Sequence, residues 1–314
     1  MKSISFVLFV ILLFVLSLNT GCTLLGYDRG LHEVTIATWN IRFLSDGSRD
    51  DHELAGIANI IERYDFVAIQ EARDTVVLDR LQTRLPGYGY LSSKPVGESV
   101  TEIYAFFYKT NLFAVLGTPY LYNDRADEFI REPFIASFRA GDFDFTLINI
   151  HVLYGTLAER RAEIRLLDDV ISIADEHNGN ENDVILLGDF NVDRDDEAWQ
   201  ISTHSAIVPA TTPTTIAGTS SYDNFWINTG ATTEYDAPVE VYRFDELLYG
   251  DDDDTASLEV SDHRPVVVRF VVDGSDDDAV GVYSGFHDTR IPSAAVQPRT
   301  CVVCSVLGVI MHGS

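Results

Sequence analysis

The chain has 314 residues, 46% of them apolar, which is enough for one large domain with its own hydrophobic core. Its 22 Lys and Arg residues are outnumbered by 49 Asp and Glu residues, giving a formal net charge of −27. This balance excludes a large basic face for nucleic acid, so any DNA binding must depend on local contacts. The acidity has two explanations, solubility and adaptation to high salt, where screening weakens self-repulsion.

The N-terminus has the pattern of an export signal. Lys2 supplies a positive charge, and residues 4–18 form an apolar run that is short for a membrane span. The small residues before Cys22 resemble a lipoprotein cleavage box, although Asn19 stands where an aliphatic residue is usual. We therefore expect a signal peptide at 1–21 and a linker at 22–30. A lipidated Cys22 would tether the chain to a membrane at the cell surface, with plain secretion and an uncleaved anchor as alternatives.

Between this signal and the C-terminal tail, we expect one domain over residues 31–272. Apolar runs predict strands at residues 34–40, 65–70, 103–108, 134–138, 143–149, 183–187 and 266–272. Helical spacing predicts a helix around residues 54–61 and one long helix over 157–176, and residues 211–221 have the composition of a surface loop. The acidic segment 273–314, which contains Cys301 and Cys304, is expected to be a mobile tail.

The order of these elements predicts the fold class. Strands and helices are mixed, and several strands follow one another without room for a helical crossover, which excludes a doubly wound parallel sheet. We therefore expect an α+β protein built as a four-layer α/β sandwich, with two packed, mostly antiparallel sheets and outer helices.

Polar side chains stand where many of the predicted strands end. A single polar residue after a strand is typical of a turn or cap, but six such places suggest side chains that converge at one rim of the sheets. These places are Trp39–Arg42, Gln70–Arg73, His151, Gly188–Asn191, Tyr222–Asn224 and Ser261–His263.

The residue types at these places favour metal-assisted hydrolysis. The carboxylates of Glu71 and Asp262 are hard oxygen ligands that suit Mg²⁺ or Mn²⁺. Two histidines with acidic partners can supply an acid and a base, and asparagine amides can donate to a phosphate oxygen. No thiol or Ser-His-Asp signature competes with this chemistry.

Eight motifs carry a family resemblance, and they occur in the family's order: TWNIR, IQEARD, EIYAFF, REPF, INIHV, GDFNVD, YDNFWI and SDHRPV. Over residues 31–272 the chain resembles the endonuclease/exonuclease/phosphatase superfamily, and within it the DNase I branch most closely. The resemblance implies a DNase I-like fold and an exported, metal-dependent phosphodiesterase that acts on DNA as an endodeoxyribonuclease. It implies no protein partner, and we expect a monomer.

The resemblance also implies roles at matching positions. The implied metal site consists of Asn40, Glu71 and Asp262. The implied catalytic groups are His151 with Glu102, His263 with Asp223, and the pair Asp189 and Asn191 that handles the nucleophile and the scissile phosphate. The implied DNA-contacting or phosphate-contacting arginines are Arg42, Arg73 and Arg131. Which histidine acts as the base stays open.

Calcium and substrate choice are the points where the resemblance is less informative. Animal DNase I relatives brace surface loops with disulfides and Ca²⁺, but no cysteine lies within residues 31–272, which argues against a Ca²⁺ requirement. Sphingomyelin or phosphoinositide hydrolysis is an alternative activity within the superfamily. A catalytically inactive surface module that binds DNA or protein is a further alternative. Arg42, Arg73 and Glu102 favour DNA, and the filled catalytic positions argue against an inactive module.

Overall fold

A computed structural model describes residues 33–274, with the exception of residues 99, 178–181, 217 and 219. The predicted signal peptide, the linker with Cys22 and nearly all of the predicted tail, with Cys301 and Cys304, lie outside the described residues. Those features stay predictions. Within the described ranges, no helix is both long enough and apolar enough to cross a membrane.

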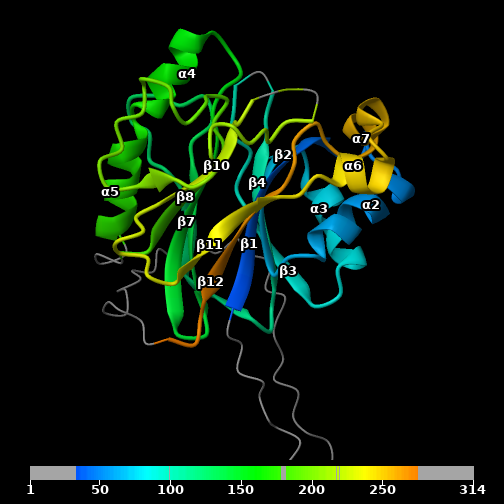
Figure 1. Cartoon of the computed structure of the whole chain (residues 1–314), viewed down its shortest axis with the longest axis horizontal. Helices are drawn as coiled ribbons and strands as arrows, with labels where there is room; N and C mark the ends of the chain where they lie inside the picture. The colour runs from blue at the N-terminus through cyan, green and yellow to red at the C-terminus, as the bar shows by residue number, and fades with distance from the viewer. Residues whose placement is uncertain (1–32, 99, 178–181, 217, 219, 275–314) are drawn as a thin grey trace, which may run out of the picture.

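Two six-stranded sheets form the centre of the molecule (Figure 1). The first sheet has the strand order β11 (Tyr235–Val241), β12 (Val266–Val271), β1 (Glu33–Leu44), β2 (Phe66–Ala72), β4 (Ile103–Lys109) and β3 (Tyr88–Ser92). The second has the order β5 (Phe113–Leu121), β6 (Phe134–Ala140), β7 (Phe143–His151), β8 (Val184–Asp189), β10 (Asp223–Ile227) and β9 (Ser205–Ala206). Among the described pairs, only β1 with β2 and β7 with β8 run parallel.

Helices cover the outer face of each sheet. The helices α2 (Asp51–Ile61), α3 (Thr75–Arg84), α6 (Phe244–Tyr249) and α7 (Asp253–Glu259) pack on the first sheet through a shared apolar cluster. The helices α4 (Leu157–Ile164) and α5 (Leu167–His177) lie on the opposite side of the molecule, against the second sheet (Figure 1). The predicted four-layer sandwich is therefore confirmed.

The space between the two sheets is filled mainly by aromatic and branched side chains. Phe66 of the first sheet meets Phe138 of the second edge to face, with ring centroids 4.8 Å apart. Phe106 makes a similar contact with Phe138 at 5.5 Å. Such edge-to-face pairs add specific geometry to apolar burial, so they fix how the two sheets sit on each other. This matters because the candidate site takes residues from both sheets.

The predicted long helix over residues 157–176 is wrong in one respect, because the structure has two helices there. The first, α4, starts after a capping box formed by Thr156 and Glu159 and ends at Ile164, with Arg165 as its C-cap. The second, α5, begins at Leu167 and buries one apolar face. The apolar spacing continues from Ile164 to Leu167 across the break, so periodicity alone could not reveal it.

Candidate active site

The candidate site lies where strands of both sheets end on the same side of the molecule. In the second sheet, His151 of β7 is paired in register with Asp189 of β8, which is in turn paired with Asp223 of β10. In the first sheet, Asn40 lies near the end of β1 and Glu71 near the end of β2. Strand pairing thus places residues that are far apart in sequence next to one another, as the polar strand ends predicted.

The first histidine forms a buried pair with a glutamate. The Nδ1 atom of His151 lies 2.7 Å from Oε2 of Glu102, and each residue is at most 4% exposed. Burial alone would raise the pKa of Glu102, but His151, Arg131 and Arg73 outweigh it and hold this pKa below its ordinary value. Glu102 therefore stays ionised, which suits it to orient the imidazole.

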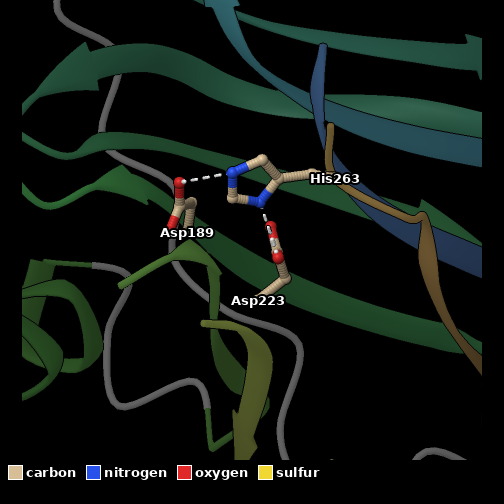
Figure 2. Close-up of side chains that lie close together, drawn as sticks. All are labelled: Asp189, Asp223 and His263. Atoms are coloured by element: carbon tan, nitrogen blue, oxygen red, sulfur yellow. Dashed lines mark hydrogen bonds and ion pairs between the residues drawn. The ribbon is translucent and has the colours of Figure 1, made fainter. Parts of the chain in front are cut away.

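The second histidine forms a matching pair with an aspartate. The Nδ1 atom of His263 lies 2.8 Å from Oδ2 of Asp223 (Figure 2). Burial disfavours the charged imidazole, yet the carboxylates of Asp223, Asp189 and Asp262 raise the pKa of His263 to about 10. Burial and the nearby charge of Asp189 raise the pKa of Asp223, although His263 opposes that shift. The imidazole of His263 therefore keeps its proton at neutral pH.

Asp189 lies between the two histidines. Its Oδ2 atom is 3.6 Å from Nε2 of His151 and 3.7 Å from Nε2 of His263, and the residue is 1% exposed. Burial opposes ionisation, but the two imidazoles and hydrogen bonds from Asn40 and Asn191 lower the pKa of Asp189. The arrangement holds one ionised carboxylate in reach of two proton-carrying groups.

Asn40 and Glu71 form a contact that fits a divalent cation. The Nδ2 atom of Asn40 donates to Oε1 of Glu71 at 3.1 Å and to Oδ2 of Asp189 at 2.9 Å. The Oδ1 atom of Asn40 is buried and has no hydrogen-bond partner. An unsatisfied amide oxygen beside a carboxylate is the type of oxygen donor that Mg²⁺ or Mn²⁺ accepts. Asp262 lies at the rim of this region, 3.8 Å from Nε of Arg42 and 44% exposed at its side chain.

Two other groups of side chains within the described ranges bring possible ligand atoms together. One consists of Asp189, Asp223 and His263, and the other of Asp245, Glu246 and Asp251. In the first group the facing atoms of Asp223 and His263 are already joined by a hydrogen bond. A cation there would have to displace that bond, whereas Oδ1 of Asn40 has no hydrogen bond to lose. In the second group Asp245 is engaged by Arg264.

Backbone strain is concentrated at this site. Glu71 and Asn191 have φ values of 63° and 50°, in a region of backbone conformation that residues other than glycine seldom adopt. The backbone N–H of Asn191 donates to Oδ1 of Asp189 at 2.9 Å, and its Nδ2 donates to the oxygen of Val152 at 2.8 Å. These bonds hold the Asn191 side chain next to the loop that follows His151.

A glycine permits the close pairing of β7 and β8. At Gly188, with φ of 143°, an added Cβ would lie 1.9 Å from the carbonyl oxygen of Ile150. Any larger residue would therefore force the two parallel strands apart, just where His151 and Asp189 are in register.

The three predicted arginines lie around the site but are already engaged. Arg131 donates to the backbone oxygens of His151 and Val152 and lies 3.3 Å from Glu102. The NH2 atom of Arg73 lies 3.4 Å from Oε2 of Glu71 and 3.6 Å from Oε1 of Glu102. Arg42 pairs with Asp262 and is the arginine of the three with the least buried side chain. Arg131 thus positions the loop as well as offering charge.

The prediction that residues 211–221 form a surface loop is wrong in part, because some of these residues are buried and support the site. Thr214 is buried and its hydroxyl accepts hydrogen bonds from the backbone of Tyr222 and Asp223, both at 3.0 Å. Thr215 forms a β-bridge with His263. The segment therefore fixes both members of the second histidine–carboxylate pair, and its Thr-rich composition gave no sign of this.

Two further supporting residues were not identified as site residues from the sequence. The hydroxyl of Ser261 donates to the oxygen of Asn40 at 2.7 Å and accepts from the backbone N–H of His263 at 3.1 Å. The hydroxyl of Tyr104 accepts from the backbone N–H of His151 at 3.0 Å. Ser261 lies in the SDH motif, so its position was a usable signal, whereas Tyr104 looks like an ordinary core residue of a strand.

Comparison of the sequence with known proteins gives a family match over most of the chain. The Endonuclease/Exonuclease/phosphatase family matches residues 37–263, which run from β1 to the second histidine. "Deoxyribonuclease-1" of Bos taurus is 32% identical over 258 residues, covering 74% of this chain and 90% of that protein. "Deoxyribonuclease" of Thioalkalivibrio sp. (strain K90mix) is 29% identical over 297 residues, covering 87% of this chain and 77% of that protein.

Solved structures agree on the fold. An endonuclease/exonuclease/phosphatase family protein from Bacteroides thetaiotaomicron superposes with a TM-score of 0.56 at 19% identity, covering 77% of this chain and 98% of that chain. The human Nocturnin catalytic domain superposes with a TM-score of 0.53 at 15% identity, covering 76% of this chain and 94% of that chain. At such identities the likeness concerns the fold alone.

The fold and the paired histidine–carboxylate contacts define a hydrolase. The chain belongs to the endonuclease/exonuclease/phosphatase family, on the branch that resembles DNase I.

Proposed function

We propose that this chain is an exported deoxyribonuclease that hydrolyses phosphodiester bonds in DNA with the help of Mg²⁺ or Mn²⁺. The observation that carries the proposal is the convergence of two histidine–carboxylate pairs on Asp189, with Nε2 atoms at 3.6 Å and 3.7 Å. The similarity to bovine Deoxyribonuclease-1 supports DNA as the substrate. Arg42, Arg73 and Arg131 supply positive charge beside the site.

The proposed reaction is the attack of water on phosphorus. One histidine accepts a proton from the water as its oxygen bonds to phosphorus, and the other histidine donates a proton to the ester oxygen as the P–O bond breaks. Asp223 and Glu102 orient the two rings, while Asp189 and Asn191 position the water and the phosphate. A divalent cation held by Glu71, with Asn40 and Asp262 close by, would neutralise charge on the phosphate oxygens.

Local charge has to overcome the charge of the whole molecule. With a net charge of −27, the protein repels DNA at long range unless salt screens the repulsion. We therefore propose that binding depends on short-range contacts at the rim of the site rather than on a broad basic face.

A plasmid-nicking assay tests the proposal directly. Wild-type protein should convert supercoiled plasmid to nicked circles in Mg²⁺ or Mn²⁺ and should be inactive in EDTA, and His151→Ala serves as the inactive comparison. Parallel assays on sphingomyelin and on a phosphoinositide cover the alternative activities. Hydrolysis of either lipid with intact plasmid would reject the nuclease, and full activity in EDTA would reject the metal. No activity on any of the three substrates would favour an inactive binding module.

Export and anchoring form a separate part of the proposal. We propose cleavage before Cys22 and lipidation of that residue, with the domain displayed outside the cytoplasm. Mass spectrometry of the mature N-terminus tests this, because a lipid-modified Cys22 supports the anchor. An unmodified N-terminus downstream of residue 22 would indicate plain secretion instead.

A further inference from the structure

An exposed phenylalanine lies beside the candidate site, outside the hydrophobic clusters of the described residues. Phe43 lies within the irregular pairing between Asn40 and Leu44, near the end of β1, and is 52% exposed. Its φ is 49°, a conformation that is unfavourable for a bulky side chain. Both the exposed apolar surface of the ring and the strained backbone are unfavourable for folding stability. The presence of phenylalanine at this position therefore calls for another explanation.

The backbone of Phe43 has a role that its side chain does not share. The N–H of Phe43 donates to Oε2 of Glu71 at 3.1 Å, which helps to orient the proposed metal ligand. Any residue other than proline supplies the same N–H, and asparagine tolerates a positive φ better than phenylalanine. The hydrogen bond therefore explains the conformation but not the aromatic ring.

Two guanidinium groups hold the ring next to the site. The Cζ atoms of Arg42 and Arg73 lie 5.4 Å and 5.3 Å from the centroid of the Phe43 ring, within the range of a cation–π contact. Arg73 is itself tied to Glu71, and Arg42 to Asp262. The ring is thus joined through both arginines to two residues of the proposed metal site, while about half of its surface stays open.

We propose that Phe43 is a stacking platform for the nucleobase of the nucleotide next to the scissile phosphate, with Arg42 and Arg73 facing the adjoining phosphates. This inference rests on the proposed nuclease function and names a specificity residue for it. Stacking on an aromatic ring suits every base, and it is an uncharged contact that salt does not screen. Such a contact is useful to a protein whose net charge of −27 repels DNA at long range.

Substitution at position 43 provides the test. Phe43→Asn keeps the backbone N–H and the positive φ but removes the ring, and Phe43→Trp restores an aromatic surface. We expect Phe43→Asn to raise KM on a DNA oligonucleotide about ten- to hundredfold with a smaller change in kcat, and Phe43→Trp to recover most of it. Ile173→Gln, at an exposed apolar position on α5, is the matched control and should behave as wild type.

Two substrates separate stacking from a general effect on the site. On a deoxyribose phosphate oligomer that has neither nucleobases nor any other aromatic ring, Phe43→Asn should lose far less kcat/KM than on DNA. On an oligonucleotide with one abasic nucleotide beside the cleaved bond, wild type and Phe43→Asn should differ little.

The outcomes distinguish this inference from the nuclease proposal. Wild-type protein that does not cleave DNA would overturn both. If wild type cleaves DNA and Phe43→Asn has the same KM, only the role of Phe43 is overturned. The same conclusion follows if Phe43→Asn loses as much kcat/KM on the abasic oligonucleotide as on DNA. It also follows if the variant loses as much kcat/KM on the substrate without nucleobases as on DNA.

Discussion

The Nδ1 atom of His263 lies 2.8 Å from Oδ2 of Asp223, and the histidine side chain is only 12% exposed. Burial would lower the pKa of the imidazole, but the neighbouring carboxylates dominate and raise it to about 10. The folded protein therefore binds this proton more tightly than the unfolded chain, in which histidine titrates near about 6.5.

Stability should fall on the alkaline side because of this pair. The stabilisation that results from a raised pKa is complete below about pH 6.5. It is lost as the pH rises toward the pKa of His263 in the folded protein. We expect the melting temperature of the metal-free protein in EDTA to decrease between about pH 7 and pH 9, below the ionisation of tyrosine. Asp223→Asn should flatten this decrease, as measured by calorimetry. An identical slope in the two proteins would mean that the pair does not govern alkaline stability.

Glu71 should control cation binding as well as turnover. A ligand that binds only the folded state raises the melting temperature, so Mg²⁺ or Mn²⁺ should stabilise wild type. Glu71→Gln should stay folded, lose most of that stabilisation and lose at least about a hundredfold in activity. Glu246→Gln, at an exposed residue grouped with Asp245 and Asp251, is the control and should keep both the stabilisation by cations and the activity. If cations still raise the melting temperature of Glu71→Gln but no longer raise that of Glu246→Gln, the metal binds at Asp245, Glu246 and Asp251 instead.

The two imidazoles should each be needed for turnover. General acid and base groups contribute about 10²–10⁴-fold, so His151→Ala and His263→Ala should each lose activity in that range. His52→Ala, at an exposed position on α2, is the control and should have wild-type activity. If one of the two variants keeps near wild-type activity, that histidine serves only the structure.

Salt should favour both activity and stability. Binding to DNA normally weakens as salt rises, because each neutralised phosphate releases counterions. Here only a few arginines contact phosphates, so DNA affinity should fall only slightly as salt rises. Screening at the same time removes the repulsion between DNA and a protein of net charge −27. We expect cleavage to tolerate, and to be enhanced by, KCl over a titration from about 0.05 to 3 M, with a rising melting temperature. Highest activity at the lowest salt, with a constant melting temperature, would reduce the acidity to a solubility feature.

The strand-end residues were predictable because pattern and chemistry agreed. Apolar runs that finish in Asn40, His151 or Asp189 marked both a strand and a polar edge, and strand pairing then brought those edges together. The resemblance to the DNase I branch supplied the partners Glu102 and Asp223, which spacing alone does not pair with a histidine.

The supporting contacts were not predictable, since they depend on three-dimensional position rather than on residue type. Thr214 lies in a stretch with the composition of a loop, and only its burial under Asp223 makes it a support. The φ of Phe43 follows from an irregularity in strand pairing, which no side-chain pattern in this segment signals. Likewise, the break before Leu167 leaves the apolar spacing unchanged.

The position of β12 has a consequence for when the protein becomes active. This last strand lies between β11 and β1, and the indole of Trp39 donates to the oxygen of His263 across 224 residues of sequence. A ribosome therefore releases Asn40 and Glu71 early, but His263 only after almost the whole domain has been made. A nascent chain therefore holds an incomplete set of reacting groups until residue 263 has been made.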